Sequence, residues 1–296
     1  MLIISEMTVY CPYWKDKPEK CLDFIRFGSF FRKSDCRVVT RFLCKNCDRS
    51  FSRSTFHACY LQKKRHKNNP LRLLLNSGVS QRRAAKILHI NRTTVSKKLQ
   101  FLGALARLDL RSFNQRSLKV QVLEFDDLET FEHTKCKPLS VTLAVDSLTR
   151  RILGFSVSQM PAKGHLSKIS IRKYGIRKDY RTEGRRSLFK KIKPYLRKDS
   201  VIKSDSNPHY VQDVREIFPN SRYETFLGQR GSITGQGELK KIRFDPLFSL
   251  NHTCAMLRAN INRLFRKTWC TTKRPDRLSD HLAIYANYHN QNLKIP

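Results

Sequence analysis

The stretch SLKVQVLEFDDLETFEHTKCKPLSVTLAVD, residues 117–146, decides the fold of the larger part of this chain. Residues 117–125 and 138–146 are runs of β-branched and apolar residues, which predict two β-strands. RILGFSVS at 151–158 predicts a third strand after a turn around Ser147–Arg150. Strands joined by so short a turn pair antiparallel, so the sheet begins as a hairpin.

The residues that follow predict helices alternating with further strands. They give a helix near 182–196, a strand at DSVIKSD (199–205), a helix at PHYVQDVREIF (208–218), a brief strand near 222–226 and a long helix from about Asp245 to Thr268. This order is typical of an α/β domain, and the hairpin at its start predicts a sheet of mixed pairing.

Carboxylates are scarce in this chain, so their positions are informative. Five of the 24 acids crowd into nine residues, namely Glu124, Asp126, Asp127, Glu129 and Glu132. Asp126 and Asp205 each end an apolar strand, and strand ends that meet at one sheet edge offer oxygen ligands for Mg²⁺ or Mn²⁺. Bound ions of this kind activate a water or a 3′-hydroxyl at a phosphodiester. The alternative is that these aspartates only cap the turn or helix that follows.

Upstream of the strands, residues 80–102 (SQRRAAKILHINRTTVSKKLQFL) predict two short helices joined by a tight turn. Ser80 is a good N-cap for the first helix, and the second begins near Arg92 with Val95 and Leu99 facing inward. This is the helix-turn-helix pattern, whose second helix enters the DNA major groove. The alternative is a two-helix packing unit with a solvated basic face. The residues expected to contact DNA are Arg92, Thr93, Ser96 and Lys97.

Six of the nine cysteines fall in the first 59 residues. A pair separated by two residues, Cys44 and Cys47, holds two sulfurs one tetrahedral edge apart, as structural Zn²⁺ requires. In the earlier run CPYW (11–14), Trp14 stands where the second Cys of such a pair would be. We therefore take Cys21 as the partner of Cys11, with Cys36 as the alternative. If no metal binds, these residues are merely buried thiols. The expected zinc ligands are Cys11, Cys21, Cys44 and Cys47.

The net charge of the chain is 59 − 24 = +35, with 40% hydrophobic residues. The hydrophobic content excludes a disordered basic tail. The repulsion among so many positive charges is unusual for a metabolic enzyme that has no polyanionic partner. Nucleic acid is therefore the expected partner. No apolar run is long enough to span a membrane, and the start MLIISEMTVY is a poor signal peptide, so we expect a cytoplasmic protein with no membrane partner.

Three motifs carry a resemblance to a known family: RFLCKNCDRSFS (41–52), LEFDDLE (123–129) and LNHTCAMLRANINRLFRKTW (250–269). Together they resemble bacterial insertion-sequence transposases of the DDE type, of the insertion-sequence-one group and its relatives, over nearly the whole chain. The resemblance implies an RNase H-like catalytic domain that cleaves the ends of an insertion element and transfers the strand into target DNA. It also implies that Asp126 and Asp205 are the first two catalytic acids and that the protein acts on double-stranded DNA as a homodimer or larger assembly.

The third catalytic position departs from the family pattern. Asn251 stands where the family has Glu, and its amide oxygen can bind Mg²⁺ without supplying charge. The resemblance implies that Arg258, which lies on the same helix face, contacts a phosphate. Asp245-Pro246 is interpreted as the helix N-cap and first residue, and Glu238 remains the alternative third carboxylate.

The sequence thus predicts three parts. Residues 1–60 form a zinc-ribbon-like DNA-binding module, 61–112 a helix-turn-helix domain with linker, and 113–296 an RNase H-like mixed-sheet α/β domain with a basic insert at about 160–198. Residues 163–198 of the insert hold 14 Lys and Arg, and we expect them to follow the phosphates of nucleoid DNA rather than form a solvated loop. The alternative function is a catalytically inactive DNA-binding regulator derived from a transposase.

Overall fold

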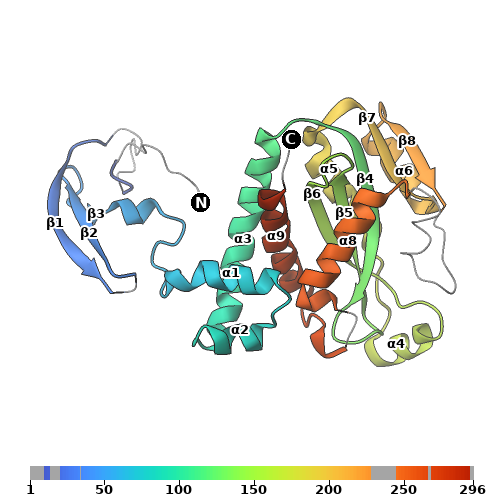
Figure 1. Cartoon of the computed structure of the whole chain (residues 1–296), viewed down its shortest axis with the longest axis horizontal. Helices are drawn as coiled ribbons and strands as arrows, with labels where there is room; N and C mark the ends of the chain where they lie inside the picture. Colours follow the sequence, from blue (N-terminus) through green and yellow to red (C-terminus); the bar gives the residue numbers. More distant parts are fainter. Residues whose placement is uncertain (1–9, 14–20, 34, 228–244, 266–267, 294–296) are drawn as a thin grey trace. The chain divides into compact units, whose positions relative to one another are not determined.

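The computed structural model describes residues 10–13, 21–33, 35–227, 245–265 and 268–293 (Figure 1). Two compact units divide the chain, Met1–Pro70 and Leu71–Pro296. Each unit has its own hydrophobic core and is described separately.

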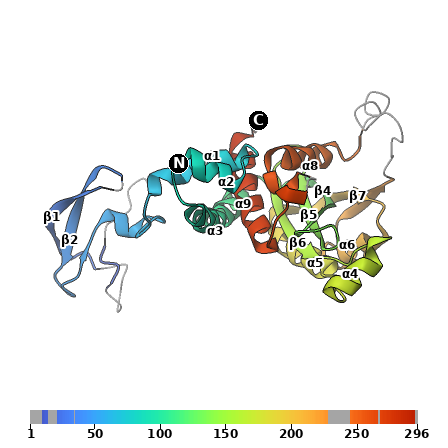
Figure 2. The same cartoon turned by 90° about the horizontal axis from the view of Figure 1, so that it is seen from below.

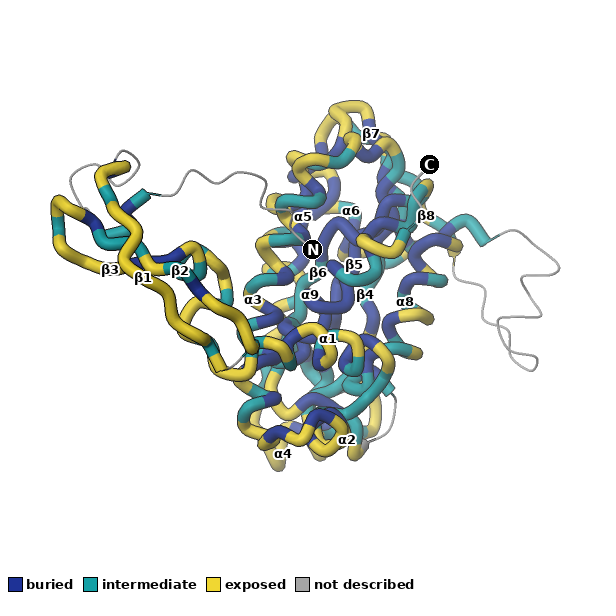
Figure 3. Tube along the Cα trace, turned by 60° about the vertical axis from the view of Figure 1, so that its left-hand side comes forward, coloured by how far each residue is buried: buried dark blue, intermediate teal, exposed yellow. Residues whose placement is uncertain are grey.

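The N-terminal unit is built on a small antiparallel sheet. Its strands are β1 (Phe24–Arg32), β2 (Arg37–Cys44) and β3 (Ser50–Phe51), in that spatial order. Phe51 packs on Cys11, Cys21 and Cys44 in the core. Short 3-10 turns follow at Arg53–Phe56 and Arg65–Lys67. The core is small, and the outer faces of β1 and β2 are mostly exposed (Figure 3).

The second unit begins with three helices, α1 (Asn68–Asn76), α2 (Gln81–Ile87) and α3 (Arg92–Arg116). Ser80 caps α2, as predicted, because its side chain accepts a hydrogen bond from the backbone N–H of Arg83. Asn91 caps α3 in the same way through the N–H of Thr93. Both helices therefore begin where a side chain satisfies a free backbone donor.

A mixed five-stranded sheet forms the centre of the second unit. The strands are β4 (Val120–Phe131), β5 (Pro138–Asp146), β6 (Ile152–Gln159), β7 (Leu196–Asp205) and β8 (Arg222–Phe226), in the order β6-β5-β4-β7-β8. β4, β5 and β6 pair antiparallel, whereas β4, β7 and β8 pair parallel. The predicted mixed α/β sheet is confirmed, and its order is consistent with an RNase H-like domain.

Helices cover both faces of this sheet (Figure 2). On one face lie α5 (Arg181–Ile192) and α6 (Pro208–Ile217), which pack on Phe125 and Ile202. On the other face lie α8 (Phe248–Asn260) and α9 (Pro275–Asn292), which pack on Leu128 and Leu143. The remaining elements are α4 (Leu166–Tyr174) and the 3-10 turns η4 (Lys193–Tyr195), η5 (Asn262–Leu264) and η6 (Thr268–Cys270).

Among the differences from the predicted element boundaries, two bear on the candidate site. β4 continues through the acids to Phe131 because residues 126–131 pair with β5, and the hydroxyl of Thr142 donates to Asp127 Oδ1 across the pair. The last long helix is interrupted after Asn260, where Ile261 adopts an extended backbone. Among the described residues, no helix combines the length and apolar character that crossing a membrane requires.

A buried histidine joins α9 to α1. The Nε2–H of His281 donates to the carbonyl of Leu75 at 2.9 Å, while its Nδ1 is buried without a partner among the described residues. Burial and the charge of Arg263 lower the pKa of His281 to about 4. The folded protein therefore requires the neutral imidazole.

We predict that this histidine makes stability fall in mild acid. Because its folded pKa lies below the unfolded value, its contribution is complete above about pH 6.5 and is lost as the pH falls toward 4. The linkage amounts to about 2 kcal/mol between about pH 7.5 and pH 5. Urea unfolding of wild type and His281→Gln at both pH values measures it, because glutamine can donate the same bond without titrating. Equal pH dependence in the two proteins would contradict the prediction.

Candidate active site

Asp126 and Asp205 lie side by side on neighbouring parallel strands. Glu124 of β4 pairs with Lys203 of β7 in the strand register. Side chains alternate between sheet faces with a period of two, so Asp126 and Asp205, each two residues further on, share the face of Glu124 and Lys203. The structure thus brings together the two aspartates that the sequence singled out, from positions 79 residues apart (205 − 126).

The charges of the two carboxylates oppose each other. Burial and the negative charge of Asp205 raise the pKa of Asp126 to about 7. Burial and the charge of Asp127 also raise the pKa of Asp205. Two carboxylates in such a setting favour a bound cation, which replaces the missing solvation and removes the repulsion. Oxygen-only donors at this position fit Mg²⁺ or Mn²⁺.

Tyr210 contacts the first aspartate from α6. The Asn207 side chain accepts from the N–H of His209 and caps α6, and this starts the helix directly after Asp205. Tyr210 is buried, and its hydroxyl donates to Asp126 Oδ1 at 3.2 Å. Burial and the nearby aspartates raise the pKa of Tyr210, so the hydroxyl remains a donor. One carboxylate oxygen of Asp126 is thereby oriented.

A buried arginine supports this tyrosine. Arg185 of α5 is 2% exposed, and its guanidinium carbon lies 4.7 Å from the ring centroid of Tyr210. Its Nε donates to Asp213 Oδ2 at 2.7 Å, and its Nη1 lies 3.8 Å from Asp127 Oδ2. The buried charge is thus paired, as its burial demands. No sequence motif pointed to a role for Tyr210 or Arg185, although Tyr210 lies in the run PHYVQDVREIF (208–218) that predicted a helix.

Glu124 holds α8 over the same region. This residue is 2% exposed, and its Oε2 accepts from the backbone N–H of Leu250 in the first turn of α8 at 2.8 Å. Its Oε1 accepts from the hydroxyl of Ser147 at 2.5 Å. A carboxylate at a helix N-terminus satisfies a free N–H and interacts favourably with the helix dipole. Glu124 is therefore an anchor for α8.

Three residues of α8 lie on one side of the helix near Asp126. Asn251, Cys254 and Arg258 are spaced by three and four residues and so share that side. Burial and then the charge of Asp126 raise the pKa of Cys254 to about 12, while Arg258 opposes the shift. Cys254 therefore lies close enough to Asp126 to be affected by its charge, with Asn251 and Arg258 one helical turn before and after it.

The third-ligand candidates have different surroundings. Asn251 is exposed, and its Nδ2 donates to Asp245 Oδ2 at 3.0 Å. The N-cap position of α8 is Leu247 rather than Asp245, but Asp245 Oδ1 accepts from the N–H of Leu247 and so still caps the chain before the helix. Glu238 lies outside the described residues.

Three of the four cysteines expected to bind zinc, Cys11, Cys21 and Cys44, cluster in the N-terminal unit with their Sγ atoms all within 4.8 Å of one another, and Cys47 lies at the edge of this cluster beside Cys11. The Sγ atoms of Cys11 and Cys47 are 3.5 Å apart, and those of Cys21 and Cys44 are 3.3 Å apart. These separations exceed a disulfide bond and approach the edge of about 3.8 Å expected when four sulfurs surround zinc at about 2.3 Å. The alternative ligand, Cys36, is exposed and lies outside the cluster.

One thiol of this cluster, that of Cys44, ionises more readily than an ordinary cysteine thiol. Burial opposes ionisation of Cys44, but hydrogen bonds from the backbone of Asn46 and from Cys21 outweigh it and lower the pKa of Cys44 to about 7. Thiolate is the form that binds metal. The donor set and its spacing therefore fit a structural zinc ion.

The candidate DNA contacts lie on the first two turns of α3. Arg92, Thr93 and Lys97 are exposed, whereas Ser96 is only partly so. Val95 and Leu99 on the opposite side are buried, as predicted.

In the basic insert, Asp179 is paired with Arg181 at 2.6 Å, so this acid neutralises little of the remaining positive charge.

No protein-family model matches the sequence, and no curated protein does. The catalytic domain of the Mos1 mariner transposase is similar at 11% identity, covering 64% of this chain and 94% of that chain, with a TM-score of 0.22. A chain of the simian T-cell lymphotropic virus intasome is similar at 16% identity, covering 70% of this chain and 73% of that chain, with a TM-score of 0.22. Scores this low do not establish a common fold, so the fold assignment depends on strand order and pairing.

We predict one zinc ion per chain at the cysteine cluster. Cys44→Ser removes one of four ligands and should lower the zinc content of purified protein well below one. Cys36→Ser is the matched control, because this exposed thiol lies outside the cluster. Metal analysis of both variants checks the prediction. The same zinc content in both proteins would contradict it.

We predict that Tyr210→Phe weakens binding of Mn²⁺ by about tenfold, because the loss of a hydrogen bond to a carboxylate costs about 1.5 kcal/mol. Titration calorimetry in the absence of DNA measures the affinity. Tyr285→Phe is the control, since that buried hydroxyl contacts Asn260. Unchanged Mn²⁺ affinity in Tyr210→Phe would show that Tyr210 does not orient Asp126.

Proposed function

We propose that the chain is a DNA transposase of the DDE type, which binds the terminal inverted repeats of an insertion element and catalyses metal-dependent cleavage and strand transfer. One observation supports this above all. Asp126 and Asp205 occupy neighbouring parallel strands on one sheet face, and burial together with the charge of a neighbouring aspartate raises the pKa of each. Such a pair is suited to holding divalent cations beside a phosphodiester.

Each residue of the site has a proposed role. Asp126 and Asp205 bind Mg²⁺ or Mn²⁺, and Asn251 contributes its amide oxygen from α8. When bound, the ions activate a water or a 3′-hydroxyl and stabilise the leaving oxygen. Arg258 contacts a DNA phosphate beside the acids, and Tyr210 positions the carboxylate of Asp126 through its hydrogen bond.

DNA recognition is assigned to the rest of the chain. The cysteine cluster is proposed as a zinc ribbon, and α2 with α3 as a helix-turn-helix whose Arg92, Thr93, Ser96 and Lys97 contact phosphates or base edges. A net charge of +35 supports a polyanionic partner. Joining two element ends requires at least two copies, so we propose a homodimer or larger assembly on DNA, acting at the nucleoid of a prokaryotic cell.

One observation favours a second candidate function. The third ligand position holds an amide, and Asn251 donates its Nδ2 to Asp245. An amide supplies no negative charge and cannot act as a general base. The second candidate is therefore a DNA-binding regulator, derived from a transposase, that has lost catalysis.

We predict that Asp126→Asn and Asp205→Asn each lower cleavage of element-end DNA by about 10³-fold in Mg²⁺ or Mn²⁺, since losing a carboxylate ligand of the ions costs several kcal/mol of transition-state stabilisation. Asp199→Asn, at an exposed position of β7, is the control and should cleave like wild type. A gel assay on labelled DNA with inverted repeats measures both cleavage and strand transfer.

The outcomes separate the two candidate functions. Equal cleavage by wild type and the Asp126 and Asp205 variants would remove both aspartates from the site. DNA binding without cleavage by any protein would favour the regulator. Strand transfer unaffected by Asn251→Ala would show that Asn251 is not the third ligand.

A further inference from the structure

We propose a second DNA-contact site in the groove between α3, β6 and α5, which would hold a stretch of sugar-phosphate backbone. The inference rests on the proposed function, because that function makes DNA the partner. The groove is separate from Asp126 and Asp205. None of its lining residues belongs to β4, α6 or α8, and Lys119 lies just before β4 begins.

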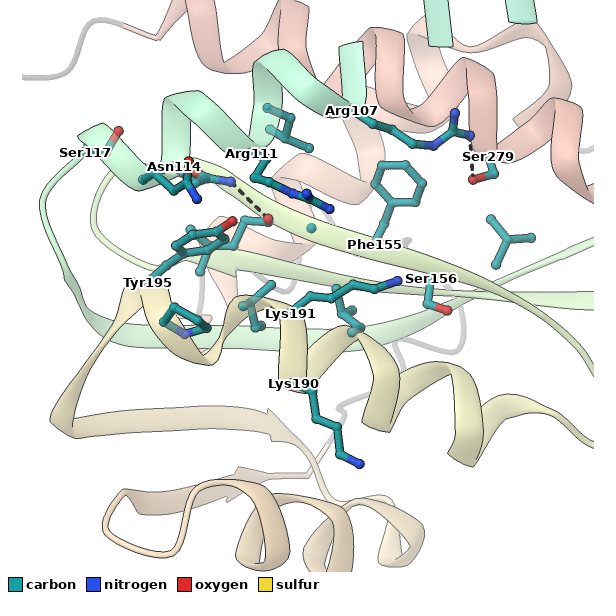
Figure 4. Close-up of a pocket in the computed structure, with 18 of the residues that line it drawn as sticks. Arg107, Arg111, Asn114, Ser117, Phe155, Ser156, Lys190, Lys191, Tyr195 and Ser279 are labelled. Carbon is teal, nitrogen blue, oxygen red and sulfur yellow. Dashed lines mark hydrogen bonds between the residues drawn. The ribbon is translucent and has the colours of Figure 1, made fainter. Parts of the chain in front are cut away.

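The groove is a large open hollow of about 930 Å³. The C-terminal half of α3 forms one wall, and the end of α5 with η4 forms the other (Figure 4). Its floor is β6, where Phe155 and Ser156 lie between the walls. β6 ends the sheet, so its outer backbone edge has no strand partner among the described residues.

The lining of the groove is strongly positive. Its single acid, Asp276, already accepts a hydrogen bond from Arg274 Nη2 at 2.6 Å. Arg107 is paired with Asp280 at 2.8 Å. No carboxylate of the described residues pairs with Arg111 or Lys191, both of which are exposed. The lining cations are Arg107, Arg111, Lys119, Lys190 and Lys191.

Two of these cations converge from opposite walls. Figure 4 shows Arg111 of α3 and Lys191 of α5 both extending over β6. Like charges aimed at one space repel each other, and an anion between them turns that repulsion into two attractions. Tyr195 and Ser117 place hydroxyl groups at one end of the same groove (Figure 4). These groups suit the oxygens of consecutive phosphates.

Specific contacts fix the two walls of the groove against β6. The Nδ2 of Asn114 donates to the carbonyl of Leu153 at 3.0 Å and ties α3 to the start of β6. On the other wall, Gly184 lets α5 approach β6 closely, since a Cβ there would lie 2.0 Å from Ser158 Oγ. The two cation-bearing helices are therefore fixed against the same edge strand.

α3 links this groove to the candidate recognition residues. Thr93 and Arg111 are 18 residues apart (111 − 93), which is five turns of an α-helix, so they lie on the same side. Lys97, Ala104 and Arg107 fall on the same exposed stripe. The stripe is about 27 Å long, or about eight base pairs of duplex. A duplex lying along it from the start of α3 brings its phosphates to the groove.

An extended peptide is the other class of ligand that fits an open strand edge. Phosphates are favoured because the cations continue beyond β6 along the α3 stripe, where a peptide paired with β6 does not reach. A peptide would also depend on backbone hydrogen bonds rather than on the charges of Arg111 and Lys191.

The test measures the salt dependence of binding to a 30-base-pair duplex by the full-length chain without added Mg²⁺. Each lost phosphate contact reduces the slope of log affinity against log salt by about 0.9. Arg111→Gln with Lys191→Gln should therefore make the slope shallower by about 1.8 and weaken binding at low salt. Arg111→Lys with Lys191→Arg keeps both charges and should keep the wild-type slope.

A charge-matched control excludes a simple effect of net charge. Lys135→Gln with Arg215→Gln removes two exposed cations that lie outside the groove and outside the basic insert, and should leave the slope unchanged. An unchanged slope in the groove variant, or an equal change in the control, overturns the proposal. Absence of DNA binding by the wild type would overturn the proposed function as well. A salt-dependent wild type with the same slope in the groove variant would overturn only the proposed role of the groove.

Discussion

The carboxylate of Glu124 makes the pair of hydrogen bonds on which the arrangement of the candidate active site depends. It lies in the middle of the sheet and accepts one bond from the first turn of α8 and one from the turn after β5. Burial raises the pKa of Glu124, and the two donors offset part of that cost by favouring the charged form. With three segments held at one buried group, α8 cannot slide along β4 without leaving a carboxylate unsatisfied.

This anchor fixes what lies two residues further along β4. Cys254, on the side of α8 that also carries Asn251 and Arg258, lies within range of the charge of Asp126, while Tyr210 reaches Asp126 from the opposite layer. The proposed metal pair is thus held by the strand register, one tyrosine hydroxyl and one anchored helix. The buried Arg185 pairs with Asp213 and lies over the ring of Tyr210, so it helps to hold Tyr210 in place against Asp126.

The sequence predicted the parts of this site that are local. Asp126 and Asp205 were identified because each follows an apolar run, and Ser80 because N-capping is a short-range effect. The role of Glu124 was not predicted, because its partner Leu250 is 126 residues away. Arg185 and Tyr210 meet only through the packing of α5 on α6. The continuation of β4 through its acids was also missed, since pairing with β5 overrides the low strand propensity of aspartate.

The proposed mechanism requires that Asp126 and Asp205 bind one set of divalent cations. Crystals of the protein soaked in Mn²⁺ test it most directly through the anomalous scattering of manganese. The account predicts an anomalous peak within coordination distance of a carboxylate oxygen of both aspartates, below α8. A peak at other side chains only, or no peak between these two aspartates at saturating Mn²⁺, would contradict it.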